Sequence, residues 1–191
     1  MSTTEPVKRA DARRNVEAIL DAATASLAVD PGVSIDKIAK AAGVGRVTLY
    51  GHFASRAVLV AEVAARAIAR TDEALDGLDL DGEPREAMAR LVEATWELTR
   101  RFGAIVMAAS EILTPAEMHR MHAGLAERVR ELVERGQESG TFRKDIPATW
   151  HLMTFQAVLH GASAAVHRGE VTAGEAPRLV RETVLATLAV R

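Results

Sequence analysis

Apolar residues recur every three or four positions through most of the chain, which is the period of an amphipathic helix. The first stripe predicts a helix over residues 11–29 and consists of Val16, Ile19, Leu20, Ala23 and Leu27. The Asp-Pro-Gly segment at 30–32 ends this helix, because proline cannot continue it and glycine frees the turn.

Two short helices joined by a tight turn are expected next. Ser34 is a good N-cap for a helix over 35–42, and Gly43 is a C-cap glycine that takes a positive φ without steric cost. A second short apolar-periodic run covers 46–53. This pair has the pattern of a helix-turn-helix, and the preceding helix is available to close its core.

The later periodic segments also predict helices. Thr114, Pro115 and Glu117 give a strong start signal, since they combine an N-cap, a proline at the first helical position and a capping-box glutamate. The chain shows no convincing strand, internal repeat or low-complexity tract. The sequence therefore predicts an all-α fold of about nine helices, the later ones covering 55–76, 84–101, 102–113, 115 to about 134 or 139, 147–168 and 175–190.

Composition narrows the class of protein. Hydrophobic residues make up 48% of the chain and aromatic residues only 4%, so alanine and the aliphatic residues must fill the core, which favours closely packed helices. The absence of cysteine excludes disulfides, thiolate nucleophiles and cysteine metal sites. The polar start is not a signal peptide, and no apolar run approaches the ~20 residues of a membrane span. We therefore expect a cytoplasmic protein without a membrane partner.

Charge is distributed unevenly along the chain. The net charge is −2, but residues 1–60 hold eight Lys/Arg against six Asp/Glu, which gives that region +2 and leaves −4 on the remainder. A mildly basic N-terminal region followed by an acidic remainder suits a protein that contacts DNA through one end only.

The segment over residues 34–59 reads SIDKIAKAAGVGRVTLYGHFASRAVL and holds an ordered motif. Its parts are Ile38-Ala39, Ala42-Gly43-Val44, Thr48-Leu49-Tyr50-Gly51-His52-Phe53 and Ser55-Arg56. Together with Ala22-Ala23, this motif closely resembles the DNA-binding domain of the tetracycline-repressor (TetR) family over about residues 13–60. A fainter resemblance lies at 140–145. The family usually has a serine where this chain has Gly45, and a larger residue in place of Gly51.

The resemblance implies a DNA-binding transcriptional regulator with no enzyme activity and no cofactor. Residues 1–54 would form the three-helix DNA-binding domain, with a flexible arm over 1–10, and residues 55–191 the helical ligand-binding and dimerisation domain. The protein would be a ligand-released repressor that binds double-stranded operator DNA as a homodimer. Two recognition helices in successive major grooves would require a pseudo-palindromic operator. A small effector would favour a state with another spacing, with the helix from 55 as the lever.

A recognition helix enters the major groove with its N-terminal residues facing the base edges. Gly45, Arg46 and Val47 occupy that end, where Arg46 suits guanine O6 and N7 and Val47 suits a thymine methyl. Leu49 and Phe53 should be core. For Tyr50 and His52 a half-buried core position is about as plausible as a phosphate contact. The remaining side chains of the expected DNA-binding set are Ser34, Lys37, Thr48 and Arg56.

The resemblance also implies an effector pocket between helices of the C-terminal domain. Its expected lining combines apolar walls with polar anchors, although such residues at helical spacing are more often plain core. This lining is Met88, Thr95, Trp96, Phe102, Met107, Ser110, His122, Trp150, Met153, Phe155 and Gln156. The last two helices would form the dimer interface as a four-helix bundle. The expected interface residues are Leu152, Leu159, Val166, Leu179, Val184 and Leu188.

Other classes of function fit the sequence less well. His119 and His122 have a spacing that metal ligands use, but no third ligand matches them, so we expect no metal site. No Ser-His-Asp order or phosphate-binding glycine loop stands out, which argues against an enzyme. The main alternative is a helical protein–protein interaction module with a degenerate helix-turn-helix.

Overall fold

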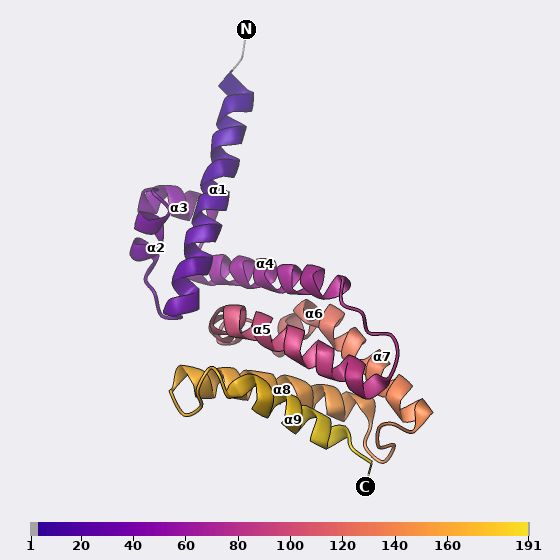
Figure 1. The fold of residues 1–191 in the computed structure, drawn as a ribbon. Helices are drawn as coiled ribbons and strands as arrows, with labels where there is room; N and C mark the ends of the chain where they lie inside the picture. Colours follow the sequence, from indigo (N-terminus) through magenta and orange to yellow (C-terminus); the bar gives the residue numbers. More distant parts are fainter. Residues whose placement is uncertain (1–3, 191) are drawn as a thin grey trace. The chain divides into compact units, whose positions relative to one another are not determined.

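The computed structural model describes residues 4–190, with side chains described from residue 11 (Figure 1). This range forms nine α-helices and a single isolated bridge between Phe142 and Ala189, which confirms the predicted all-α class. None of its helices has the length and apolar character needed to cross a membrane. The helices are α1 (Thr4–Val29), α2 (Ile35–Ala41), α3 (Arg46–His52), α4 (Arg56–Asp76), α5 (Pro84–Ser110), α6 (Pro115–Met121), α7 (Ala123–Ser139), α8 (Ala148–His167) and α9 (Ala176–Leu188).

Contacts divide the described residues into two compact units. The first holds the residues up to Ile68 together with Ala104–Met118, and the second holds Ala69–Gly103 and the residues from His119 onward. In the first unit, α2 packs on α1 and α3 packs on α2 (Figure 1). The fully buried side chains between these three helices include Ile19, Ala23, Leu27, Ile38 and Leu49.

Local signals position the two short helices. The Oγ atom of Ser34 accepts a hydrogen bond from the backbone N–H of Lys37 at 3.4 Å, which is the predicted N-cap. Gly43 has φ +70°, which confirms the predicted left-handed residue in the turn. Leu49 and Phe53 are buried, as their spacing predicts.

The first helix is longer than predicted. It begins at Thr4 rather than near residue 11, so residues 4–10, expected as part of a flexible arm, are helical. Pro6 falls in the first turn, where a missing N–H costs nothing, and the residues after it are good helix formers. Residues 1–3 of the expected arm lie outside the described residues.

Two other helix boundaries also differ from the prediction. The segments 84–101 and 102–113 form one continuous helix, α5. Gly103 does not end it but allows close packing, since a Cβ there would lie 2.8 Å from the Oγ of Ser163. Conversely, the helix predicted from 115 is interrupted at His122, with φ −93° and ψ 11°. Its predicted capping box is confirmed, because Thr114 N–H donates to Glu117 at 2.8 Å and Glu117 N–H donates back at 3.3 Å.

The second unit is built around one hydrophobic cluster from the end of α4, from α5, α7, α8 and α9, and from the turn after α7. α8 packs against both α7 and α9 (Figure 1). Arg128 of α7 forms ion pairs with Asp72, at 3.0 Å, and with Asp76. Fully buried members of the cluster include Met88, Leu91, Phe142, Phe155 and Leu188.

Candidate DNA-binding interface

One face of α3 is exposed while the opposite face is buried. Leu49 is fully buried, whereas Arg46, Val47 and Thr48 in the first turn are exposed. Val47 is 88% exposed, an unusual position for a β-branched apolar side chain at a helix start. A Cβ added at Gly51 would meet nothing within 4 Å, so this position is also open. The exposed face of α3 is therefore available to a partner along its whole length.

The guanidinium group of Arg46 is held by two neighbours. Its NH1 atom lies 3.2 Å from both carboxylate oxygens of Asp36, in the first turn of α2. Its Cζ atom lies 5.5 Å from the ring centroid of Tyr50, one helical turn further along α3. Tyr50 is 38% exposed, so it is not the core tyrosine that the sequence left open.

The other predicted DNA contacts divide into free and engaged side chains. Lys37 and Thr48 are exposed, whereas His52 is half-buried. Ser34 is exposed but serves as the N-cap of α2. Arg56 is half-buried and donates to the backbone carbonyl of Pro31 at 2.5 Å, so in the free protein it closes the loop between α1 and α2.

Comparison with known proteins shows the family to which this chain belongs. Residues 19–63 match the family model for bacterial regulatory proteins of the tetR family, and residues 84–177 match the tetracyclin repressor-like C-terminal domain. The chain is also 30% identical over 171 residues to the HTH-type transcriptional repressor LfrR of Mycolicibacterium smegmatis, covering 87% of each protein. The chain belongs to the TetR family.

Further relatives agree with this assignment. The HTH-type transcriptional regulator NfxB of Pseudomonas aeruginosa is 24% identical over 173 residues, which cover 88% of this chain and 91% of that protein. Among solved structures, LfrR in complex with proflavine has a TM-score of 0.71 at 24% identity, covering 93% of this chain and 99% of the other. A TetR-family regulator from Rhodococcus has a TM-score of 0.74 at 19% identity, covering 92% and 98%. This TetR-family protein is a DNA-binding transcription regulator and not an enzyme.

The predicted effector-pocket residues fall into buried and exposed groups. Met88, Thr95, Trp96 and Phe102 of α5 and Phe155 of α8 are buried. His122 and Gln156 are half-buried, whereas Ser110 is exposed. The three remaining members, Met107, Trp150 and Met153, are 47%, 59% and 61% exposed.

The exposure of Trp150 and Met153 has a simple geometric cause. The buried face of α8 carries His151, Phe155 and Leu159 at four-residue spacing. Trp150 and Met153 lie on another side of the same helix and point away from the core of the second unit. Neither side chain therefore contributes to the core of the second unit, where the pocket was expected.

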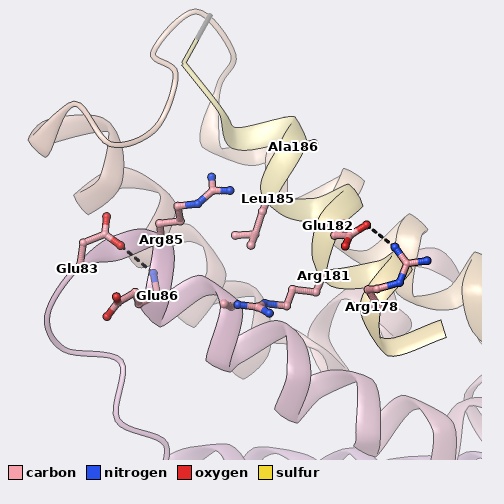
Figure 2. A pocket seen from close by; sticks show the side chains of 9 residues that line it. Glu83, Arg85, Glu86, Arg178, Arg181, Glu182, Leu185 and Ala186 are labelled. Carbon is pink, nitrogen blue, oxygen red and sulfur yellow. Dashed lines mark hydrogen bonds and ion pairs between the residues drawn. The ribbon is translucent and has the colours of Figure 1, made fainter. Parts of the chain in front are cut away.

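A groove in the second unit has a different lining from the predicted pocket. It lies between the start of α5 and α9 (Figure 2). Its volume is about 620 Å³. Several of its charged side chains already have partners. Arg178 forms an ion pair with Glu182 at 2.8 Å, and the Glu83 carboxylate accepts a hydrogen bond from the backbone N–H of Glu86 at 2.9 Å (Figure 2). None of the predicted pocket residues lines this groove. The groove residues are Glu83, Arg85, Glu86, Ala89, Arg178, Arg181, Glu182, Leu185 and Ala186.

Several buried polar atoms of the second unit have no hydrogen-bond partner. They include Thr95 Oγ1, Trp96 Nε1 and both ring nitrogens of His151. Burial lowers the pKa of His151, and the nearby positive charge of Arg143 lowers it further, while Asp145 raises it slightly. Sequence reasoning missed His151 because it shares the apolar stripe of α8.

Two histidines of the second unit lie against each other. His122 and His160 lie edge to face with ring centroids 6.3 Å apart. Burial, and to a lesser extent His122, lowers the pKa of His160, so its neutral form is favoured. Within the part of the chain that the structure describes, no group of three or more acidic or histidine side chains is placed to hold a metal ion.

The residues predicted for the dimer interface fall into a buried group and a partly exposed group. Leu159, Val184 and Leu188 are buried in the core of one chain, so they offer no surface for a second chain to cover. Leu152 and Val166 are half-buried and pack against the same cluster, and Leu179 is 38% exposed. Of the six residues, Leu179 is the most exposed.

Proposed function

We propose that this regulator represses transcription by binding a pseudo-palindromic operator as a homodimer, and that a small effector releases it. The observation that carries the proposal is the first turn of α3, where Arg46 and Val47 are both exposed. An arginine suits the O6 and N7 acceptors of guanine, and a valine methyl suits the C5-methyl group of thymine. Lys37 and Thr48 are exposed nearby and would contact phosphates, which fix the position of the protein on the duplex.

The apolar surface of α8 and α9 supports the homodimer. On α8, Trp150 and Met153 are exposed, and Ala157 and Gly161 continue the same side at helical spacing. On α9, which packs beside α8, Leu179 is exposed, and so is Val190 just beyond the end of the helix. Two copies of this surface facing each other would form a four-helix bundle with twofold symmetry. We therefore assign Trp150 and Met153 to the interface instead of the pocket.

The buried polar atoms of α5 support an effector site in the second unit. Thr95 Oγ1 and Trp96 Nε1 are buried without partners, and an unpaired buried polar group costs about 1–3 kcal/mol. A ligand that accepts a hydrogen bond from the indole N–H would remove that cost. The fully buried polar side chains of the described residues are Thr95 and His151, with no carboxylate among them. We therefore propose a neutral, mostly apolar or aromatic effector with at least one hydrogen-bond acceptor.

Selection of DNA by the purified protein tests the proposed function. A random duplex pool should yield one inverted-repeat sequence, measured at a fixed moderate salt because phosphate contacts make affinity salt-dependent. Arg46→Ala should then weaken binding to that duplex by about 1–3 kcal/mol, or about 5- to 150-fold. Arg85→Ala is the matched control, since it removes an exposed positive charge from the second unit.

The outcome separates the regulator from a helical interaction module. Enrichment of one sequence that depends on Arg46 supports a direct reading of operator bases. No enrichment at any salt would refute operator binding and favour the interaction module. Equal weakening by Arg46→Ala and Arg85→Ala would mean that Arg46 contributes only charge.

A further inference from the structure

Asp36 binds the residue that is expected to read the operator. It lies in the first turn of α2, across the helix-turn-helix from Arg46, and the two side chains are 63% and 61% exposed. Both carboxylate oxygens face the same guanidinium nitrogen, NH1, at 3.2 Å. Tyr50 supports the guanidinium from a second direction, with its ring centroid 5.5 Å from Cζ. Arg46 is thus oriented before it meets DNA.

The geometry leaves one edge of the guanidinium unused. Arginine has five N–H donors in a planar fork, and the edge formed by Nε and NH2 carries two roughly parallel ones. In Arg46 this edge has no hydrogen-bond partner among the residues that the structure describes, and Asp36 contacts NH1 instead. Two parallel donors match the O6 and N7 acceptors of guanine. The ion pair therefore leaves the base-reading edge available.

We propose that Asp36 is a positioning residue that sets the sequence specificity of this regulator, an inference that rests on the proposed operator reading by Arg46. A free arginine at the start of α3 could turn to the nearest phosphate and bind any sequence. Asp36 holds NH1 and also repels phosphate oxygens, so the arrangement favours a duplex that offers guanine to the open edge. Asp36 contributes by restricting Arg46 rather than by contacting a base.

Asp36→Asn tests the proposal with little change in shape. The probes are the duplex enriched by the wild-type protein and a scrambled duplex of equal length. The ratio of their dissociation constants should fall by about fivefold, the upper range for one exposed ion pair. Binding to the scrambled duplex should gain about one counterion in its salt dependence, because Arg46 is free to contact a phosphate.

Base preference at single positions separates positioning from general destabilisation. Arg46→Ala first identifies the base pair whose discrimination depends on Arg46. Asp36→Asn should relax preference at that base pair only, and Asp36→Glu should restore part of it. In an Arg46→Ala background, Asp36→Asn should change nothing further. Glu62→Gln, which removes an exposed negative charge from α4 in the same unit, is the matched control for charge.

Each outcome supports or overturns the proposal. Unchanged discrimination at the Arg46-dependent base pair in Asp36→Asn would overturn it. Equal relaxation at all positions, with a lowered unfolding temperature, would overturn it in favour of a structural role. A similar loss of base discrimination in Glu62→Gln would mean that net charge alone causes the effect, which would also overturn the proposal. A wild-type protein that enriches no duplex would instead refute the proposed function itself, a result that precedes any comparison of variants.

Discussion

Gly136 lies in the last turn of α7, close to the turn that follows this helix. A Cβ at this position would overlap the ring of Phe142, which is buried. The ring has little room to move, because Phe142 N–H donates to the carbonyl of Gly136 at 2.9 Å. The next residue is fixed as well, since Arg143 N–H donates to the carbonyl of Leu188 at 3.0 Å. Gly136→Ala therefore forces the Phe142 ring out of its place in the core.

The size of the effect follows from two opposing contributions. Overpacking of a core costs about 1–3 kcal/mol, and the restrained ring puts Gly136→Ala near the upper end. Replacing a glycine inside a helix by alanine stabilises the helix by about 1 kcal/mol. The net loss in the free energy of unfolding is therefore about 2 kcal/mol. In a chain of this length that loss corresponds to a fall of about 4–8 °C in Tm.

Thermal and urea unfolding, followed by circular dichroism at one fixed protein concentration, measure this loss. Gly51→Ala is the control, because the added Cβ meets nothing within 4 Å and should stabilise the protein by up to about 1 kcal/mol. Gly136→Ala should cost less in a Phe142→Leu background than in the wild-type chain. A Gly136→Ala protein that is as stable as the wild type would refute the packing argument.

Two further predictions concern α8. Since burial lowers the pKa of His151, the unfolded chain binds a proton at a higher pH than the folded one, so stability is present above pH 6.5 and is lost as the pH falls toward the folded pKa. His151→Leu should flatten this dependence in urea titrations from pH 7 downward, and an unchanged slope would contradict it. Met153→Glu should give a folded monomer in sedimentation experiments, because it places a charge on the proposed interface; a dimer of unchanged affinity would exclude this face.

The sequence allowed the helix-turn-helix to be predicted almost to the residue, because its signals are local. The cap at Ser34 and the positive φ of Gly43 depend on the neighbouring backbone and on little else. The break at His122 and the continuity of α5 through Gly103 carry no such signal. These features depend on which distant side chains pack against the helix, as Ser163 does against Gly103.

The functional residues could be predicted from the sequence only where they belong to a local motif. Arg46 could be singled out from its place in a motif, but Asp36 could not, because its role depends on the fold bringing α2 next to the start of α3. On α8, apolar residues line more than one side, so spacing alone does not tell which side is buried. For this reason the sequence predicts Trp150 and Met153 as pocket residues, while the structure buries His151 and Phe155.

Under the proposed dimerisation through α8, the abundance of this protein becomes a factor in its own stability. One side, with Phe155 and Leu159, is covered within the chain, and the other, with Trp150 and Met153, would be covered only by a second copy. Mass action then couples assembly to folding, because a partner that binds only the folded state stabilises it in proportion to the logarithm of its concentration. Dilution alone would lower the unfolding temperature. A cell that makes few copies would hold the regulator closer to its unfolding threshold than a concentrated sample does.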